Sequence, residues 1–185
     1  MRIFYELGED LRMKGRWHLA GPVDDEQRDE REFIQGKVVN LRSPLNSRIY
    51  AHGSPLDFTF TLLQIPIVSP RFANTVRSLV GDQAQWLPVH IDGHEGFEVL
   101  NAQQLVRCID EGRSEFIKWH EEDGRPDKLG GYRMVTRLRL DPTQIPGNLH
   151  IFRVMGWKIA LIVSQAFVDA IRPLNPIGPK LELVT

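Results

Sequence analysis

One pattern that occurs twice limits the folds open to this chain. Residues 157–174 read WKIALIVSQAFVDAIRPL, and their first half is a nearly unbroken apolar run, typical of a short strand covered on both faces. The second half places apolar residues at helical spacing on one face: Phe167, Ala170, Ile171 and Leu174. Ser164 stands at the junction, where its hydroxyl can accept from the free N–H groups of a first helical turn. The segment predicts a strand, then a helix capped by Ser164 and ended by Pro173.

The same pattern is present 95 residues earlier. Seven positions correspond at that single spacing: Ile67, Val68, Ser69, Phe72, Val76, Arg77 and Leu79 match Ile162, Val163, Ser164, Phe167, Ile171, Arg172 and Leu174. Pro70 takes the first helical position, where its missing N–H costs nothing, and Gly81 supplies a helix stop. Strand-like runs follow at residues 86–91 and 181–184. The chain is therefore expected to contain two similar strand-helix-strand units.

Short strands and turns are expected elsewhere. Residues 132–140 alternate, with Met134, Thr136, Leu138 and Leu140 on one face and Arg133, Val135, Arg137 and Arg139 on the other. This predicts a strand with one buried side and one side that carries three guanidinium groups. Asn101 is expected to begin a short helix, although the residues after it also suit a strand. Many short strands with few helices predict an α+β fold with mixed or antiparallel sheets.

Length and composition bound the class of protein. The 185 residues are enough for one domain, 1–185, and two halves, 1–100 and 101–185, each with one unit, are the alternative division. A net charge of −1 gives no global reason to expect direct binding to nucleic acid or to an anionic membrane. No apolar run approaches the ~20 residues that span a bilayer. One cysteine and no signal-peptide pattern favour a soluble cytoplasmic protein.

Residues with catalytic or metal-binding chemistry are few and scattered. His90, Asp92 and His94 are the nearest approach to a metal site, but no further histidine or cysteine lies close in sequence to complete it. Ser69 and Ser164 lack the Gly-x-Ser-x-Gly elbow of a nucleophile, and glycine-rich phosphate loops are absent from the sequence. We therefore expect no enzyme, metal or cofactor. A metal-dependent hydrolase that uses His90, Asp92 and His94 is the alternative.

Charged clusters are the remaining candidates for binding a partner. Two are acidic, in segments 24–32 and 121–123, and one is the basic face of residues 132–140. The candidate residues are Asp24, Asp25, Glu26, Asp29, Glu30, Glu121, Glu122, Asp123, Arg133, Arg137 and Arg139. A plain structural explanation stands beside this one, because charge runs are usually solvated and arginines on a strand often pair with neighbouring carboxylates.

Five segments resemble a known family: YELGED, PIVSPRF, FEVLNAQQLVRCIDEGRSE, DPTQIPGNLHIFRVMGW and IALIVSQAF. They are similar to the Imm11 immunity proteins of myxobacteria and other bacteria. The resemblance spans nearly the whole chain and is strongest over residues 65–167. No catalytic motif comes with it. One departure is at residues 176–179, where Pro-Ile-Gly-Pro replaces the Thr-Gly that usually precedes the last strand.

The resemblance implies an immunity protein that binds a co-encoded antibacterial toxin and neutralises it by stoichiometric occlusion. The partner would be a toxin protein encoded by an adjacent gene. If that toxin were a basic nuclease, the two acidic clusters would mimic phosphates. A self-associating or ligand-binding structural module is a further alternative, and the sequence leaves the oligomeric state open.

Overall fold

The computed structural model describes residues 2–25 and 29–185 and places most of their strands in two five-stranded sheets. The first sheet has the order β14 (Pro179–Leu183), β1 (Phe4–Glu9), β13 (Trp157–Ser164), β12 (Ile151–Val154) and β9 (Leu105–Val106). The second has the order β3 (Leu45–Asn46), β7 (Ala84–His90), β8 (Glu98–Ala102), β6 (Pro66–Val68) and β5 (Phe58–Phe60). Two further pairs are β2 (His18–Leu19) with β4 (Ile49–Ala51), and β10 (Glu115–Lys118) with β11 (Tyr132–Arg137).

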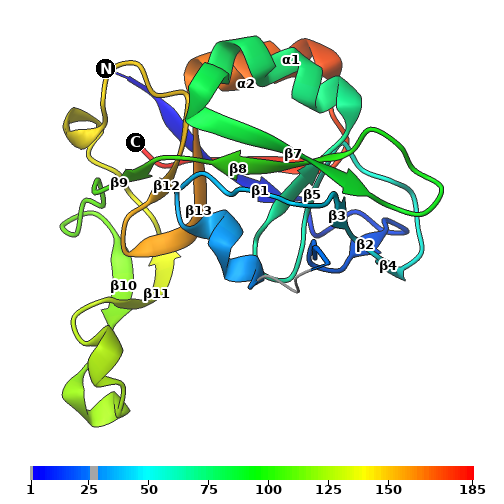
Figure 1. The fold of residues 1–185 in the computed structure, drawn as a ribbon. Helices are drawn as coiled ribbons and strands as arrows, with labels where there is room; N and C mark the ends of the chain where they lie inside the picture. The colour runs from blue at the N-terminus through cyan, green and yellow to red at the C-terminus, as the bar shows by residue number, and fades with distance from the viewer. Residues whose placement is uncertain (1, 26–28) are drawn as a thin grey trace.

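Two α-helices, α1 (Pro70–Val80) and α2 (Gln165–Ile171), lie side by side over the sheets (Figure 1). The shorter 3-10 turns are η1 (Glu30–Ile34), η2 (Gly81–Gln83), η3 (Glu121–Asp123), η4 (Pro126–Lys128), η5 (Pro142–Gln144) and η6 (Arg172–Leu174). The predicted α+β class is confirmed. No helix in the described part of the chain is long and apolar enough to cross a membrane.

The predicted start and end signals of both helices are confirmed. Ser69 Oγ accepts from the backbone N–H of Phe72, and Ser164 Oγ accepts from that of Phe167, both at 3.3 Å. α1 ends at Gly81, whose φ of +52° a residue with a side chain rarely adopts. α2 stops two residues before Pro173 and continues as the 3-10 turn η6.

The two strand-helix-strand units have equivalent topology. β6 and β7 are parallel and separated by β8, which is antiparallel to both. β13 and β14 are likewise separated by β1, which is antiparallel to both. The 95-residue spacing extends through these pairings, because Leu87 lies opposite Val99 of β8 while Glu182 lies opposite Glu6 of β1. The middle strand follows its unit in one case and comes from the N-terminal region in the other.

The helices bury one core against the same side of both sheets. This cluster takes residues from both units: Leu7, Phe58, Val68, Phe72, Ala73, Val76, Val80, Ala84, Leu100, Ala102, Ile151, Leu161, Val163, Phe167, Val168 and Ile171. Phe72 and Phe167 occupy equivalent positions and contact each other, with ring centroids 6.2 Å apart. Two further clusters include buried residues on the opposite faces of the sheets, one around Trp17 and one around Phe152. The two units therefore share a core.

The predicted helix at Asn101 is wrong. Asn101 lies in β8 and is fully buried, with its side-chain amide donating to the carbonyl oxygen of Lys37 (3.0 Å) and to Gln85 Oε1 (3.2 Å). Leu105 then begins the short strand β9. Contacts with residues distant in sequence decide this segment, and its local composition does not reveal them.

Candidate interaction surface

A β-hairpin, which we call the arm (residues 111–137), projects from the body of the molecule. It contains β10, η3, η4 and β11, and Figure 1 shows it extending away from the sheets on the side opposite the helices. β10 and β11 pair only with each other among the described strands, and no residue of the arm falls in the buried class. A two-stranded hairpin of this kind has little stability of its own, so side-chain contacts and its base must hold it.

Aromatic rings stacked with cations stiffen the arm. Phe116 and Tyr132 meet edge to face with centroids 5.3 Å apart, and the Lys118 ammonium lies 5.4 Å from each ring centre. Nearer the tip, Lys128 Nζ lies 5.0 Å and the Arg133 guanidinium 5.1 Å from the ring of Trp119. Each cation–π contact contributes about 0.5–1 kcal/mol at such exposed positions. These contacts give the arm a defined conformation, unlike that of a loose loop.

Both predicted basic residues of the arm are paired. Arg133 forms an ion pair with Asp123, whose second oxygen accepts from the backbone N–H of residue 120 at 2.9 Å. Arg137 lies 3.5 Å from Glu115. Arg139 is at the base, where it donates to the carbonyl oxygens of residues 138 (2.9 Å) and 183 (3.1 Å). Of the three guanidinium groups predicted on this strand face, two are therefore paired with carboxylates and the third is bound to carbonyl oxygens.

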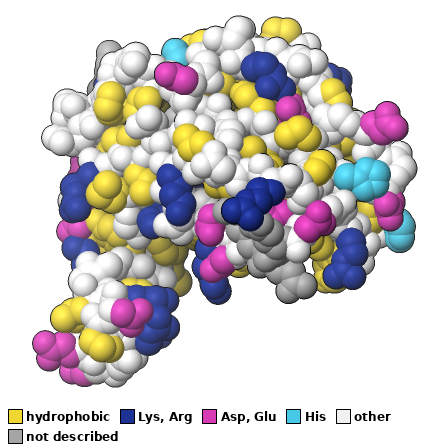
Figure 2. Space-filling model, in the orientation of Figure 1, with side chains coloured by type: hydrophobic (Ala, Val, Ile, Leu, Met, Phe, Trp, Pro, Cys, Tyr) yellow, Lys and Arg dark blue, Asp and Glu magenta, His cyan; other side chains and the backbone are white. Residues whose placement is uncertain are grey.

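Two acidic residues at the tip of the arm differ from the other acids of the arm in their lack of an ion pair among the described residues. Glu121 and Glu122 are exposed and have no ion pair within residues 2–25 and 29–185. Figure 2 shows acidic side chains gathered at the far end of the arm. Of the cluster predicted at 121–123, two carboxylates remain available to a partner.

The predicted buried face of residues 132–140 is only partly correct. Leu138 and Leu140 are buried, at 7% and 0% exposure, but Met134 is 43% exposed and Thr136 is exposed. β11, which ends at Arg137, lies in the arm, where no second layer of described elements buries its residues. Its pairing with β10 is also interrupted by two register shifts. Alternation identified a strand correctly but could not indicate what covers it.

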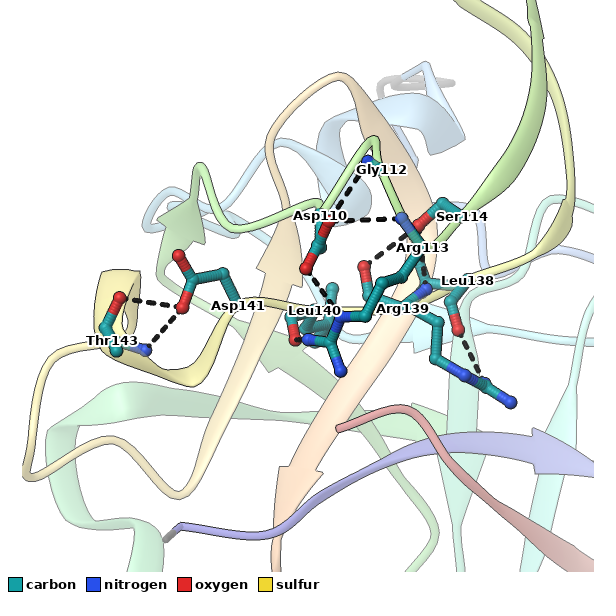
Figure 3. Close-up of polar contacts among 9 residues, drawn as sticks. All are labelled: Asp110, Gly112, Arg113, Ser114, Leu138, Arg139, Leu140, Asp141 and Thr143. Atoms are coloured by element: carbon teal, nitrogen blue, oxygen red, sulfur yellow. Dashed lines mark hydrogen bonds and ion pairs between the residues drawn. The ribbon is translucent and has the colours of Figure 1, made fainter.

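A hydrogen-bond network fixes the base of the arm (Figure 3). Asp110 accepts from the backbone N–H of Arg113 (3.1 Å) and from its Nε (2.6 Å), and Arg113 also donates to the carbonyl oxygen of Leu140 (2.8 Å). These bonds from Arg113 hold the pKa of Asp110 below its usual value. Ser114 Oγ donates to the Arg139 carbonyl (3.0 Å) and accepts from the Arg139 N–H (2.9 Å). The network ties the start of the hairpin to residues 110, 139 and 140 at its base.

The roles of Asp110 and Ser114 were not predicted. Their signal was the segment CIDEGRSE, in which an acid precedes Gly-Arg-Ser, a composition typical of a turn closed by an Asp side chain. Interpreting it required the partner strand at residues 137–140, which is distant in sequence.

The acidic segment 24–32 is not one open patch. Asp24 is buried at 5% exposure, while Asp25 and Asp29 are exposed. Asp29 caps η1 by accepting from the N–H of Arg31 at 2.9 Å, and the half-buried Glu30 carboxylate lies against Gly21. Glu26 lies outside the described residues. Part of this predicted cluster therefore has a structural role. The cluster as a whole lies in a different segment of the chain from the arm.

The residues of the alternative metal site do not converge. His90 and Asp92 are exposed, with 3.4 Å between Nε2 and Oδ1, but the His94 ring packs on Trp17 at 4.9 Å and near Phe97 at 6.3 Å. Within residues 2–25 and 29–185, no group of three or more His, Cys, Asp or Glu side chains is arranged to hold a metal ion. These residues form a turn between β7 and β8.

The serines and the cysteine also have structural roles. His150 Nδ1 lies 2.9 Å from Ser164 Oγ, an arrangement that resembles a nucleophile and a base. In the other unit, however, Ser69 Oγ donates to Asp57 at 2.7 Å, and Asp57 occupies the position that corresponds to His150, just before the neighbouring strand. Both pairs orient a helix cap. Burial, with a smaller effect of Asp141, raises the pKa of the Cys108 thiol to about 12, which removes thiolate reactivity.

The fold and this surface together define a class: an α+β protein of two equivalent units that share one core and carry a stiffened, projecting hairpin. Residues 51–183 match the Imm11 immunity protein family, and the chain belongs to that family. A comparison with curated proteins finds no match. The matched residues include both units and the arm, whereas β1 and the acidic segment 24–32 precede them.

Proposed function

We propose that this immunity protein binds an antibacterial toxin in the cytoplasm of the producing cell and neutralises it by stoichiometric occlusion, without catalysis. Membership of the Imm11 family supports an immunity role. The observation that carries the binding mechanism is the arm, which projects from the body and contains no buried residue. The single buried cysteine suits a reducing compartment.

The arm has the composition of a contact surface. Its exposed apolar side chains include Ile117, Leu129 and Met134, at 45%, 53% and 43% exposure. Trp119 and Arg133 stack on each other at its tip, and Trp, Met and Arg are enriched in protein interfaces. A stiff hairpin loses little conformational entropy when it binds, so more of its contact energy is available as affinity.

The tip also indicates the charge of the partner. Glu121 and Glu122 are the arm's acids without an ion pair in the described part of the chain, so a toxin surface that bears cations would complement them. Such a basic surface is what a nuclease toxin would present. Complementary charge of this kind accelerates association more than it strengthens the final complex.

The test is binding to an inactivated toxin domain, beginning with the toxin that we propose is encoded by an adjacent gene. In Glu121→Lys/Glu122→Lys, the association rate constant should fall about tenfold or more at low salt, and the difference should shrink as salt is raised. The matched control, Asp82→Lys/Asp92→Lys, makes the same charge change at exposed acids of the body and should leave the rate nearly unchanged. Protection of toxin-producing cells should follow the same order.

A second variant tests the arm as a whole. Replacement of residues 119–131 by a two-residue Asn-Gly turn should abolish binding while the thermal unfolding of the body is retained, because none of these residues is buried. If this shortened protein binds and protects as well as the wild type, the arm is not the toxin-binding element.

A further inference from the structure

An apolar surface outside the arm has no role in the proposed function. Leu11, Tyr50 and Leu62 are the most exposed large hydrophobic side chains in the described part of the chain, at 73%, 70% and 82% exposure. All three line one hollow of about 180 Å³, and Tyr50 and Leu62 also line a second of about 530 Å³. We call these three residues the Leu62 patch. Single exposed leucines are ordinary, but a contiguous apolar group is typical of an interaction surface.

The backbone holds Leu62 outward in a fixed position. Residues 61–65 form a tight loop in which Gln64 N–H donates to the Thr61 carbonyl and Thr61 N–H donates to the Ile65 carbonyl, both at 3.0 Å. Gln64 has a φ of +58°, an uncommon conformation for a residue other than glycine. Such a conformation persists only where the surrounding structure enforces it.

A buried arginine holds Gln64 in this conformation. Arg153 is fully buried in β12 and donates to the Gln64 carbonyl oxygen at 3.0 Å and to the Lys158 carbonyl oxygen at 2.8 Å. Burial lowers the pKa of Arg153 to about 9. The cost of burying a guanidinium is thus partly offset by carbonyl oxygens, one of which belongs to the loop that presents Leu62.

Among the described residues that line the two hollows, carboxylates and guanidinium groups are equal in number. Glu9 and Arg16 lie beside the smaller hollow and pair with each other. Glu30 and Arg48 line the larger hollow, and neither has an ion-pair partner within residues 2–25 and 29–185. A partner surface of one sign would leave either the acid or the base covered and unpaired, which is costly.

A second copy of the chain meets both requirements. At a two-fold interface each residue i meets residue j of the partner while j meets i, so Glu30 of each copy would face Arg48 of the other. The patch also offers both projecting side chains and hollows, so two copies supply knobs and holes to each other. From these observations we propose that the Leu62 patch is a two-fold interface that joins two copies of this chain, separate from the toxin-binding arm.

Sedimentation analysis of the purified protein from micromolar to submillimolar concentration tests this proposal. The wild type should dimerise reversibly, and Leu62→Asp should weaken dimerisation at least about a hundredfold by burying a charge in the interface. The control Leu129→Asp makes the same change at an exposed leucine of the arm and should dimerise normally. Circular dichroism would verify that each variant is folded.

Charge exchange makes the test specific to a two-fold interface. Glu30→Arg and Arg48→Glu should each weaken dimerisation at least about tenfold, and the double variant Glu30→Arg/Arg48→Glu should restore it. A wild type that stays monomeric throughout, a double variant no better than the singles, or equal effects of Leu62→Asp and Leu129→Asp would each overturn the proposal. Loss of toxin binding by Leu62→Asp in a monomeric wild type would assign the patch to the toxin instead.

Discussion

At the residue scale, Asp57 joins three parts of the chain. Its carboxylate is 5% exposed and accepts from Ser69 Oγ (2.7 Å), from the backbone N–H of Ile177 (2.7 Å) and from the Arg71 guanidinium. Burial alone would raise the pKa of Asp57, but the hydrogen bonds from Arg71, Ile177 and Ser69 outweigh it and lower the pKa. The next residue after Ile177, Gly178, has a φ of +110°, and a Cβ there would lie 2.3 Å from a backbone oxygen of β5.

Asp57→Asn should destabilise the protein by about 2 kcal/mol at pH 7, because hydrogen bonds to a buried charged group are weakened. Since the folded-state pKa lies below the unfolded value of about 3.9, the carboxylate's contribution is present above that pH and is lost as pH falls through the folded pKa. Urea unfolding should therefore show the gap between wild type and variant closing in acid. Asp127→Asn, at an exposed pair with Arg125, should leave stability nearly unchanged at either pH because solvent screens that pair. Equal losses in the two variants would contradict this assignment.

At the element scale, the pairing of β1 with β14 in the first sheet contains an unfavourable pair of residues. Glu6 of β1 lies directly opposite Glu182 of β14, and like charges in that position are destabilising. Burial, followed by repulsion from Glu182, raises the pKa of Glu6 despite the opposing effect of Lys180. The folded protein therefore binds this proton more tightly than the unfolded chain does.

Glu6→Gln should stabilise the protein at pH 7 by about 0.5 kcal/mol, since it removes the repulsion while keeping a similar side-chain shape. Because the folded pKa is raised, wild-type stability increases as pH falls through it, and the advantage of the variant should disappear near pH 4. Thermal unfolding at both pH values measures this. Glu98→Gln provides the comparison: Glu98 forms an ion pair with Arg77, so its loss should give no stabilisation. A destabilised Glu6→Gln protein at neutral pH would show that the carboxylate has a favourable partner.

Local signals explain which elements could be predicted from the sequence. Ser69, Pro70 and Ser164 specify helix starts through contacts within three residues, so the two units were identifiable. The partners of those serines, Asp57 and His150, lie in the segments before the neighbouring strands and could not be predicted from local pattern. The same holds for the arm. Its charges were visible in the sequence, but pairing of those charges depends on how β10 and β11 align.

At the scale of the whole molecule, the two similar units differ by a circular rearrangement of their strands along the chain. In the first unit the chain runs through β5, β6, α1, β7 and β8, and β8 inserts between β6 and β7. In the second it runs through β12, β13, α2 and β14, and the inserted strand is β1, from the opposite end of the chain. The two ends meet, since the Val184 N–H donates to the Phe4 carbonyl oxygen at 3.1 Å (Figure 1).

This arrangement leads us to propose that residues 1–185 unfold as one cooperative unit. The second half, 101–185, lacks the strand that separates β13 from β14, and either half alone would expose its side of the core shared by α1 and α2. Expressed separately, residues 1–100 and 101–185 should each be unfolded by circular dichroism and by amide proton dispersion. A half that folds alone would show that the two units are independent domains.

A circular permutant provides the complementary test. If the chain begins at Gln104, passes from Thr185 through a short Gly-Ser linker to Met1 and ends at Gln103, β1 follows β14 just as β8 follows β7. The permutant keeps every strand pairing, so it should unfold in one transition with a loss of only about 1–2 kcal/mol, the scale of a change in loop entropy. Calorimetry should give equal van't Hoff and calorimetric enthalpies for both proteins. Two separate transitions in the permutant would mean that the covalent path through residues 103–104 holds the units together, and that the shared core around Phe72 and Phe167 does not.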